Sequence, residues 1–233
     1  MPSVWPTSET AGTQSVSVSG EKAISNPLPF AVDTLPETFD LEANNDAEHA
    51  QAISPPIIVN GRIDQPGEVD VFRVEGRAGD EIVAEVHARR LASPLDSVLK
   101  LTEATGKQLA FNDDYEDKAS GLNTHHADSH LRATLPANGT YYLHLADTQR
   151  KGGDEYAYRL RVSPPRPDFE LRVVPASLTA RAGMSVPLTV YALRKDGFTN
   201  EITLAFKDAP AGFTLSGARV PANQDQVRMT LTA

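Results

Sequence analysis

Residues 69–86 read VDVFRVEGRAGDEIVAEV, and this stretch decides the fold class of the chain. In the first run, VDVFRVEG, side chains alternate so that Asp70 and Phe72 point to one face and their neighbours to the other. A turn is expected at 76–80, and a second apolar run, IVAEV, follows at 82–86. Two short runs of period 2 around a glycine-containing turn predict a pair of β-strands.

Similar short runs occur on both sides of this stretch, and almost no segment shows a sustained 3.6-residue stripe. The further strand-like runs lie at 57–59, 97–101, 108–111, 131–135, 141–145 and 156–162. Many short strands separated by turns are typical of an antiparallel β-sandwich. We therefore expect an all-β chain with a sandwich at 57–163.

Three further segments surround this predicted sandwich. Residues 14–32 read as a two-stranded hairpin within a segment 1–36, and 37–56 read as an acidic linker that ends in two prolines. A short helical turn capped by Asn45 is expected inside the linker. A second strand series occupies 168–233, and its last apolar strand suggests a sandwich that is cut short.

Composition excludes several classes of protein. The chain has 233 residues, and 22 Lys and Arg against 31 Asp and Glu give a net charge of −9. This acidic balance argues against a nucleic-acid partner, and the absence of a long apolar run argues against membrane insertion. Cysteine is absent, which removes disulfides, thiolate metal sites and cysteine nucleophiles.

The N-terminal residues MPSVWPTSET contain neither a basic region nor an apolar core of a signal peptide. Two interpretations follow. The chain is either cytoplasmic or an internal piece of a longer exported protein, in which case it would be secreted, periplasmic or held at the cell surface.

Ordered sequence fragments between Leu41 and Val162 resemble the bacterial pre-peptidase C-terminal domain. They are EANN at 42–45, VNGRI at 59–63, PGEVDVF at 66–72, AGD at 78–80, SPLD at 93–96, NDD at 112–114, DSHL at 128–131 and ANGTY at 137–141. The resemblance implies a jelly-roll-like antiparallel β-sandwich of a kind that is appended to exported proteases and often binds calcium. Residues 171–233 resemble the start of an Ig-like sandwich, and 14–32 resemble the end of another.

The first candidate metal site is the acidic linker and the turn into the strand at 69. Ca²⁺ prefers six to eight oxygen ligands, and the oxygen-bearing side chains of the linker are Asp40, Glu42, Asn44, Asn45 and Asp46. Within the resemblance, Glu42, Asn44 and Asn45 match the family's linker ligands, and Glu68 and Asp70 match those of the turn. Two departures, Ala43 for proline and Glu68 for aspartate, imply a weaker site. The alternative is a solvated linker without an ion.

Two other clusters contain residues that could bind a metal. Asp96, Asn112, Asp113, Asp114 and Asp128 could form a second Ca²⁺ site, although local turn capping is the favoured interpretation. His126, Asp128 and His130 would share one face of a strand and could hold a transition metal. Consecutive same-face residues of a strand converge poorly on one ion, which disfavours this third site.

No motif of a nucleotide-binding loop, zinc protease or serine hydrolase occurs in the chain. We therefore expect a non-catalytic, calcium-stabilised accessory module of a larger exported bacterial protein, whose parent is a peptidase or another exported enzyme. Its expected partners are neighbouring domains and an extracellular polymer or cell-surface component, as in adhesion. The alternatives are a passive spacer and a metal-dependent hydrolase fragment.

Overall fold

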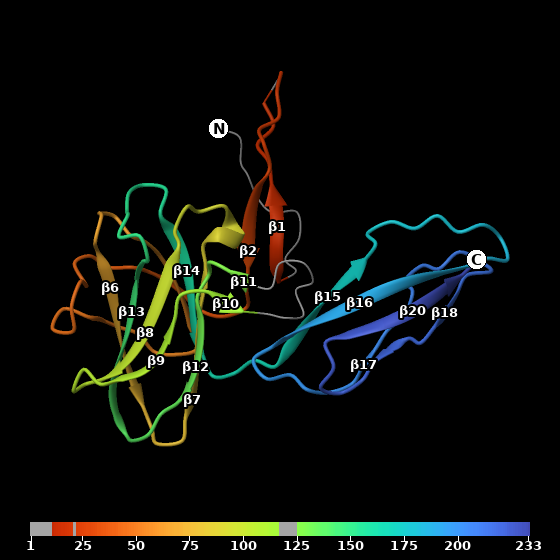
Figure 1. The fold of residues 1–233 in the computed structure, drawn as a ribbon. Helices are drawn as coiled ribbons and strands as arrows, with labels where there is room; N and C mark the ends of the chain where they lie inside the picture. Colours follow the sequence, from red (N-terminus) through yellow and green to blue (C-terminus); the bar gives the residue numbers. More distant parts are fainter. Residues whose placement is uncertain (1–10, 21, 117–124) are drawn as a thin grey trace. The chain divides into compact units, whose positions relative to one another are not determined.

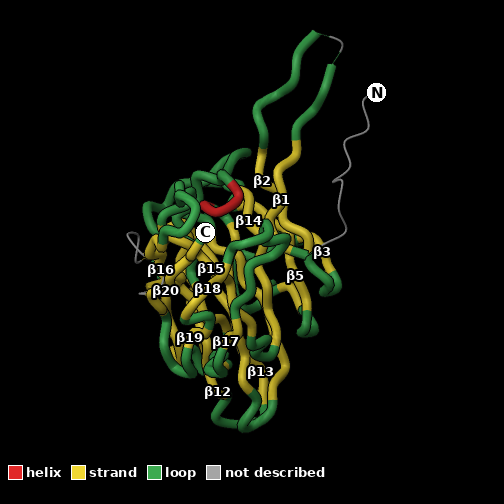
Figure 2. The backbone as a smooth tube through the Cα atoms, turned by 90° about the vertical axis from the view of Figure 1, so that its right-hand side faces the viewer, coloured by secondary structure: helices red, strands yellow, loops and turns green. Residues whose placement is uncertain are grey.

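The computed structural model describes residues 11–20, 22–116 and 125–233. These residues form β-strands, turns and a short 3₁₀ helix, η1 (Arg89–Leu91), without any α-helix (Figures 1 and 2). The predicted all-β class is therefore confirmed. Among the described residues, no helix has the length and apolar character that crossing a membrane requires.

The chain divides into two compact units, which we describe separately. The N-terminal unit holds the described residues up to Tyr115 together with His126–Pro164. The C-terminal unit holds Pro165–Ala233, with which Glu116 and His125 are grouped. The expected segment 1–36 begins outside the described residues, which start at residue 11.

Two five-stranded sheets build the sandwich of the N-terminal unit (Figure 1). The first has the order β12 (His130–Thr134), β7 (Glu81–His87), β14 (Ala157–Ser163), β5 (Ile57–Arg62) and β3 (Glu37–Phe39). The second has the order β4 (Gln51–Ala52), β6 (Val69–Gly76), β13 (Gly139–Asp147), β8 (Ser97–Glu103) and β9 (Gln108–Asn112). A separate two-stranded sheet pairs β10 (Tyr115–Glu116) with β11 (His125–His126).

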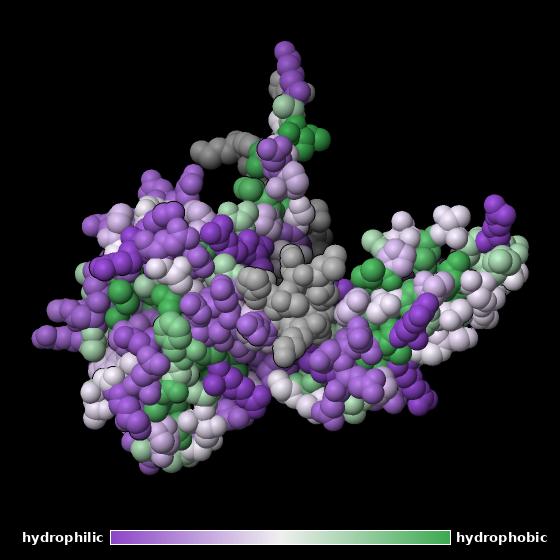
Figure 3. Space-filling model, in the orientation of Figure 1, coloured by the Kyte–Doolittle hydropathy of each residue, from purple (hydrophilic) through white to green (hydrophobic). Residues whose placement is uncertain are grey.

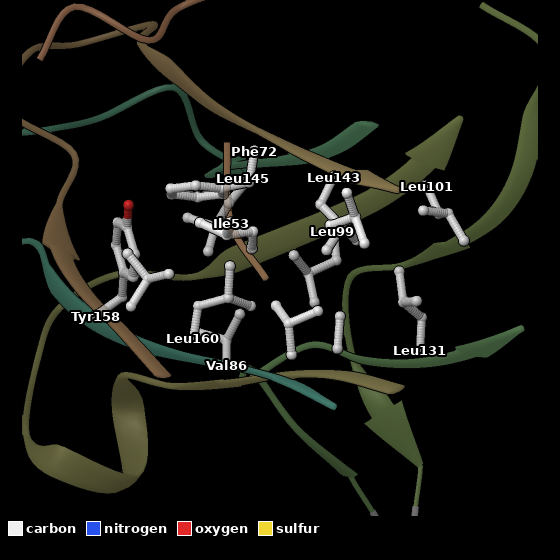
Figure 4. Packing of buried hydrophobic residues seen from close by; sticks show 14 of the residues in the cluster. Ile53, Phe72, Val86, Leu99, Leu101, Leu131, Leu143, Leu145, Tyr158 and Leu160 are labelled. Atoms are coloured by element: carbon white, nitrogen blue, oxygen red, sulfur yellow. The ribbon is translucent and has the colours of Figure 1, made fainter. Parts of the chain in front are cut away.

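Alternating side chains of these strands fill the space between the two sheets (Figure 4). Phe72 of β6, Leu143 of β13 and Leu101 of β8 lie opposite one another across three neighbouring strands, and all three are fully buried. Polar side chains cover much of the visible outer surface of this unit (Figure 3). The period-2 pattern thus produces one apolar core, as the sequence predicted.

The expected linker at 37–56 is instead part of the sandwich. Its strand β3 pairs in parallel with β5 in the first sheet, and its strand β4 pairs in parallel with β6 in the second sheet. The side chain of Gln51 joins the two ends of this segment, because its amide lies 3.0 Å from both the Phe39 oxygen and the Leu41 nitrogen. The segment therefore spans from one sheet edge to the other.

The helical turn predicted in this segment is wrong in detail. Residues 47–49 form a simple turn rather than a helix. Asp46, and not Asn45, caps it, since Oδ1 of Asp46 accepts hydrogen bonds from the backbone nitrogens of Glu48 and His49, each at 2.9 Å. An aspartate side chain that binds amides two and three residues ahead stabilises a turn without a following helix.

Gly61 lies inside β5, which continues beyond the strand-like run predicted at 57–59. A Cβ atom at this position would overlap the ring of Tyr158, which crosses the strand here, and would approach Asp40 Cβ to 2.8 Å. The glycine is therefore needed for the close approach of a ring to the backbone.

The predicted hairpin at 14–32 is confirmed. Its strands β1 (Gly12–Val16) and β2 (Leu28–Val32) pair antiparallel, with Gly12 opposite Val32 and Val16 opposite Leu28.

A four-stranded antiparallel sheet and a two-stranded sheet form the C-terminal unit. The larger sheet has the order β15 (Asp168–Val174), β16 (Ser185–Lys195), β20 (Gln226–Thr232) and β18 (Thr214–Ser216), and the smaller pairs β17 (Ile202–Thr203) with β19 (Arg219–Val220). Buried side chains such as Leu188, Val190 and Met229 form its core. The strand series expected at 168–233 is thus present as these two sheets.

Candidate metal centre

Asp70 is the innermost residue of the candidate site. It lies at the start of β6, on the same face as the core residue Phe72, and is fully buried. The hydroxyl of Tyr158, from β14, donates a hydrogen bond to Asp70 Oδ2 at 2.5 Å. The second oxygen, Oδ1, is buried and has no hydrogen-bond partner in the described part of the chain.

Asn44 contributes a second buried oxygen without a partner. Its backbone oxygen accepts a hydrogen bond from the Val71 nitrogen at 2.9 Å, which attaches the segment to the start of β6. Its side-chain nitrogen donates to Asp40 Oδ1 at 2.7 Å. The amide oxygen, Oδ1, is left without a donor among the described residues. Because the nitrogen is fixed by Asp40, the amide oxygen has a defined direction.

The carboxylates of Asp40, Glu42 and Asp70 gather around this point. Each offers an oxygen, and these oxygens lie within 4.8 Å of one another. Asp40 follows β3 and is anchored by its own backbone, since its nitrogen donates to the Asn60 oxygen of β5 at 2.9 Å. The site therefore joins the end of the edge strand of one sheet to the start of an inner strand of the other.

Burial and mutual repulsion raise the pKa values of these carboxyl groups. Burial raises the pKa of Asp70 to about 9, with further contributions from the charges of Asp40, Glu42 and Glu68. Burial also raises the pKa of Asp40, and burial together with the neighbouring carboxylates raises that of Glu42. Carboxyl groups held this close favour a proton or a cation between them.

Glu68 and Asp64 lie on the turn that leads into β6. Glu68 Oε2 accepts hydrogen bonds from the backbone nitrogens of Asp64 and Gln65, the latter at 2.9 Å. Asp64 pairs with Arg62. Glu68 therefore closes its own turn with one oxygen, while its negative charge still acts on Asp70 and Glu42.

Three of the five residues predicted for this site are brought together, namely Glu42, Asn44 and Asp70. Asn45 is exposed, and Glu68 accepts hydrogen bonds from the backbone nitrogens of Asp64 and Gln65. Asp40 was among the linker oxygens but was not predicted as a ligand, and Tyr158 was not predicted as part of the site. The position of Tyr158 has no local sequence signal, because it is 88 residues from Asp70.

The donor atoms at this site are all oxygens from carboxylates and an amide. Hard cations such as Ca²⁺ prefer oxygen ligands, whereas Zn²⁺ in proteins is bound mainly by nitrogen and sulfur. Two buried oxygens without donors are the feature that a bound cation would satisfy. The residues present therefore fit Ca²⁺.

The second predicted cluster is not brought together as a ligand set. Among the described residues, no group of acidic or histidine side chains other than Asp40, Glu42 and Asp70 meets the spacing of a metal site. Asp96 approaches Gln149 at 3.3 Å, and Asp113 binds the adjacent Asp114 nitrogen. Local hydrogen bonds of this kind are what turn capping predicts. Asp117, next to this cluster in the sequence, lies outside the described residues.

Two more members of this cluster hold neighbouring loops in place. Asn112 donates to the Asp114 oxygen at 2.9 Å and accepts from the His130 nitrogen at 2.8 Å. The carboxylate of Asp128 is fully buried and accepts from the backbone nitrogens of Ala88, Arg89 and Arg90.

Asp128 also pairs with the guanidinium of Arg90, whose Nε lies 2.7 Å away. Four donors therefore share its two oxygens, which leaves little capacity for a metal ion.

The predicted histidine strand is interrupted. His126 ends β11 and His130 begins β12, and a bend separates them at 127–128. The rings of both histidines instead pack against Tyr115, with centroid distances of 5.4 and 4.7 Å. The bend at 127–128 separates the three residues, and Asp128 binds Arg90. His126, Asp128 and His130 therefore do not share one strand face, contrary to the expectation.

Comparisons with known proteins find no matching family profile. A probable subtilase-type serine protease from Deinococcus radiodurans is 42% identical over 95 residues, which are 39% of this chain and 12% of that protein. Most of the relative's length thus has no counterpart in this chain.

Two solved structures match this chain at low sequence identity and low TM-score. A periplasmic inhibitor of g-type lysozyme from Salmonella Typhimurium is 15% identical, with a TM-score of 0.31, and the match covers 49% of this chain and 97% of the inhibitor. The pre-peptidase C-terminal domain of a collagenase from Bacillus anthracis is 18% identical, with a TM-score of 0.36, and the match covers 52% of this chain and all of that domain. A pre-peptidase C-terminal domain is thus among the solved structures that match this chain.

Proposed function

We propose that the N-terminal unit is a non-catalytic accessory module of a larger exported bacterial protein, stabilised by Ca²⁺ bound at Asp40, Glu42, Asn44 and Asp70. The observation that carries this proposal is the pair of buried oxygens, Asn44 Oδ1 and Asp70 Oδ1, that lack donors in the described part of the chain. Leaving such groups unsatisfied costs about 1–3 kcal/mol each. A cation between them would remove that cost.

The site has a specific mechanical role in this proposal. Asp40 follows β3 at the edge of one sheet, and Asp70 begins β6 in the other sheet. An ion that binds both would fix the segment 40–44 across the end of the sandwich. It would thereby hold the chain that enters the sandwich from β2 in one direction. The module would position a neighbouring domain in a calcium-dependent manner.

Thermal unfolding of chelator-treated protein, titrated with Ca²⁺, Mg²⁺ or Zn²⁺, tests this function. An ion present at 100 times its Kd adds about 2.7 kcal/mol to the free energy of unfolding. For a chain of this size, the unfolding temperature should rise by several degrees. Asp70→Asn and Glu42→Gln should abolish the Ca²⁺-dependent rise. Asp113→Asn, which changes an exposed carboxylate with a local hydrogen bond, should keep it.

Terbium luminescence provides an independent readout of the same site. Tb³⁺ replaces Ca²⁺ at oxygen sites and emits when a nearby excited tyrosine transfers energy to it. Tyr158 lies directly beside the proposed ligands Asp70 and Asp40. Emission should saturate with added Tb³⁺, fall when Ca²⁺ competes and decrease strongly in Tyr158→Phe. Tyr142→Phe, on the opposite face of β13 from the core, should leave the emission unchanged.

The two alternatives predict different results in these experiments. A passive spacer would show no thermal shift with any ion and no saturable terbium emission. A metal-dependent hydrolase fragment that uses His126 and His130 would be stabilised by Zn²⁺ but not by Ca²⁺. Either result would overturn the calcium proposal.

The setting of the module in a larger exported protein is part of the proposal. It is supported by the match to a stretch of a probable subtilase-type serine protease. We further propose an extracellular polymer or cell-surface component as its partner. Cosedimentation of the chain with insoluble polymers, in Ca²⁺ and in chelator, tests this binding.

A further inference from the structure

The edge strand β15 of the C-terminal unit is exposed along almost its whole length. It pairs with β16 on one side, and no described strand pairs with its other edge. All of its residues except Phe169 are exposed, including Leu171, Val173 and Val174. A seven-residue edge strand with exposed apolar side chains is a template for pairing with another strand.

The apolar inner face of the sheet continues to this edge. Leu171 lies opposite Ala192, and Val173 lies opposite Val190. Ala192 and Val190 are both buried, whereas Leu171 is 43% and Val173 47% exposed. Opposite residues of an antiparallel pair point to the same side of a sheet. Leu171 and Val173 therefore extend the buried face beyond the core, and apolar surface is visible on this unit (Figure 3).

We propose that β15 pairs with β15 of a second copy of this chain, antiparallel and centred on Leu171. A two-fold axis normal to the sheet keeps both apolar faces on the same side. In this register Leu171 faces Leu171, and each Phe169 faces Val173 of the other copy. Each Glu170, which also pairs with Lys195 of its own sheet, faces Arg172 of the other copy, and this gives two pairs of opposite charge on the outer face.

The neighbouring registers are less favourable for reasons of charge. Centring the pair on Phe169 places Asp168 opposite Glu170 twice. Centring it on Glu170 places two glutamates opposite each other, and centring it on Arg172 places two arginines opposite each other. Centring it on Val173 brings Pro175, which has no N–H to donate, into the pairing and separates Glu170 from Arg172. Like charges directly opposite each other destabilise a strand pair. The sequence of β15 thus selects one self-complementary register.

Sedimentation equilibrium over a concentration series tests the association. The chain of 25.2 kDa should approach twice that mass as its concentration rises. Glu170→Arg and Arg172→Glu should each weaken self-association at least tenfold, because each makes the facing pairs alike in charge. An equimolar mixture of the two variants should restore the dimer, since every facing pair is then of opposite charge. Arg228→Glu, on the exposed face of β20, is the matched control and should leave the association unchanged.

Single cysteines test the register directly, because the chain contains no cysteine of its own. Leu171→Cys should form a disulfide-linked dimer rapidly under mild oxidation. Phe169→Cys and Val173→Cys should each cross-link slowly alone and rapidly when mixed. A cooperative unfolding transition near the wild-type temperature establishes that each variant folds.

Three results would overturn the proposal. The first is a chain that stays monomeric up to its solubility limit. The second is a dimer whose stability does not respond to the charge variants or to their mixture. The third is equal cross-linking by all three single cysteines. Each would rule out the pairing of two β15 strands in this register.

Discussion

The hydroxyl of Tyr158 lies 2.5 Å from Oδ2 of Asp70, although 88 residues separate the two in the sequence. This contact orients the Asp70 carboxyl so that Oδ1 remains available to another group. The same hydroxyl lies 3.2 Å from Oδ2 of Asp40. One phenol therefore aligns two of the proposed calcium ligands.

Tyr158→Phe should lower the free energy of unfolding of the calcium-free protein by about 1–3 kcal/mol, because a buried carboxyl oxygen loses its partner. Urea unfolding in the presence of a chelator measures this loss. Tyr142→Phe is the control, since Tyr142 lies on the outer face of the same sandwich. Equal stability of the two variants would contradict the role given to the Tyr158 hydroxyl.

The contribution of Asp70 to the stability of the calcium-free protein should fall as the pH rises from about 4 toward 9. The pKa of Asp70 is raised to about 9 in the folded state, whereas an unfolded aspartate titrates near 3.9. Between these values the folded Asp70 binds more protons than the unfolded one, so its contribution to stability falls with increasing pH. Asp40 and Glu42 act in the same direction.

Urea unfolding at a series of pH values, with and without Ca²⁺, tests this dependence. Ca²⁺ should remove most of the loss, because the ion replaces the protons. The difference in unfolding free energy between the wild type and Asp70→Asn in chelator isolates this contribution, since asparagine does not titrate and the other titrating groups are common to both. A difference that does not fall with increasing pH in this range would refute the assignment.

Gly61→Ala should destabilise the N-terminal unit by about 1–3 kcal/mol, the usual cost of overpacking. The added Cβ would overlap the ring of Tyr158 and approach Asp40. It should also weaken calcium binding, because it displaces the ring that orients Asp70. Gly139→Ala is the matched control, since no atom lies within 4 Å of a Cβ at that position. Thermal unfolding of both variants measures the loss of stability, and terbium titration measures the loss of affinity for the ion.

Asp128→Asn should destabilise the sandwich by about 1–3 kcal/mol, with and without Ca²⁺, because it removes one of the two carboxylates that pair with Arg90 and an acceptor of buried backbone N–H groups. If Asp128 were instead a calcium ligand, the difference in unfolding free energy between the wild type and Asp128→Asn would be larger in Ca²⁺ than in chelator. Comparing unfolding free energies in chelator and in Ca²⁺ separates the two roles.

Much of the fold could be predicted because strand signals are local. The alternation in VDVFRVEG identifies β6 and its buried face, since side chains of a strand alternate over neighbouring residues. The same reasoning located the hairpin at 14–32. It failed for β3 and β4, which are only three and two residues long. Strands this short have no measurable period, and the acidic residues between them resemble a linker.

The amino-acid sequence by itself determined the all-β class and the positions of the long strands. It also placed Glu42 and Asn44 together in the acidic segment and Asp70 just after the turn into β6. Only the tertiary structure decided which oxygens meet. Strand pairing between distant segments brings Tyr158 to Asp70, and it commits Asp128 to Arg90 instead of to an ion. The physical reason is that alternation depends on adjacent residues, whereas a ligand set depends on the register between strands that are far apart in sequence.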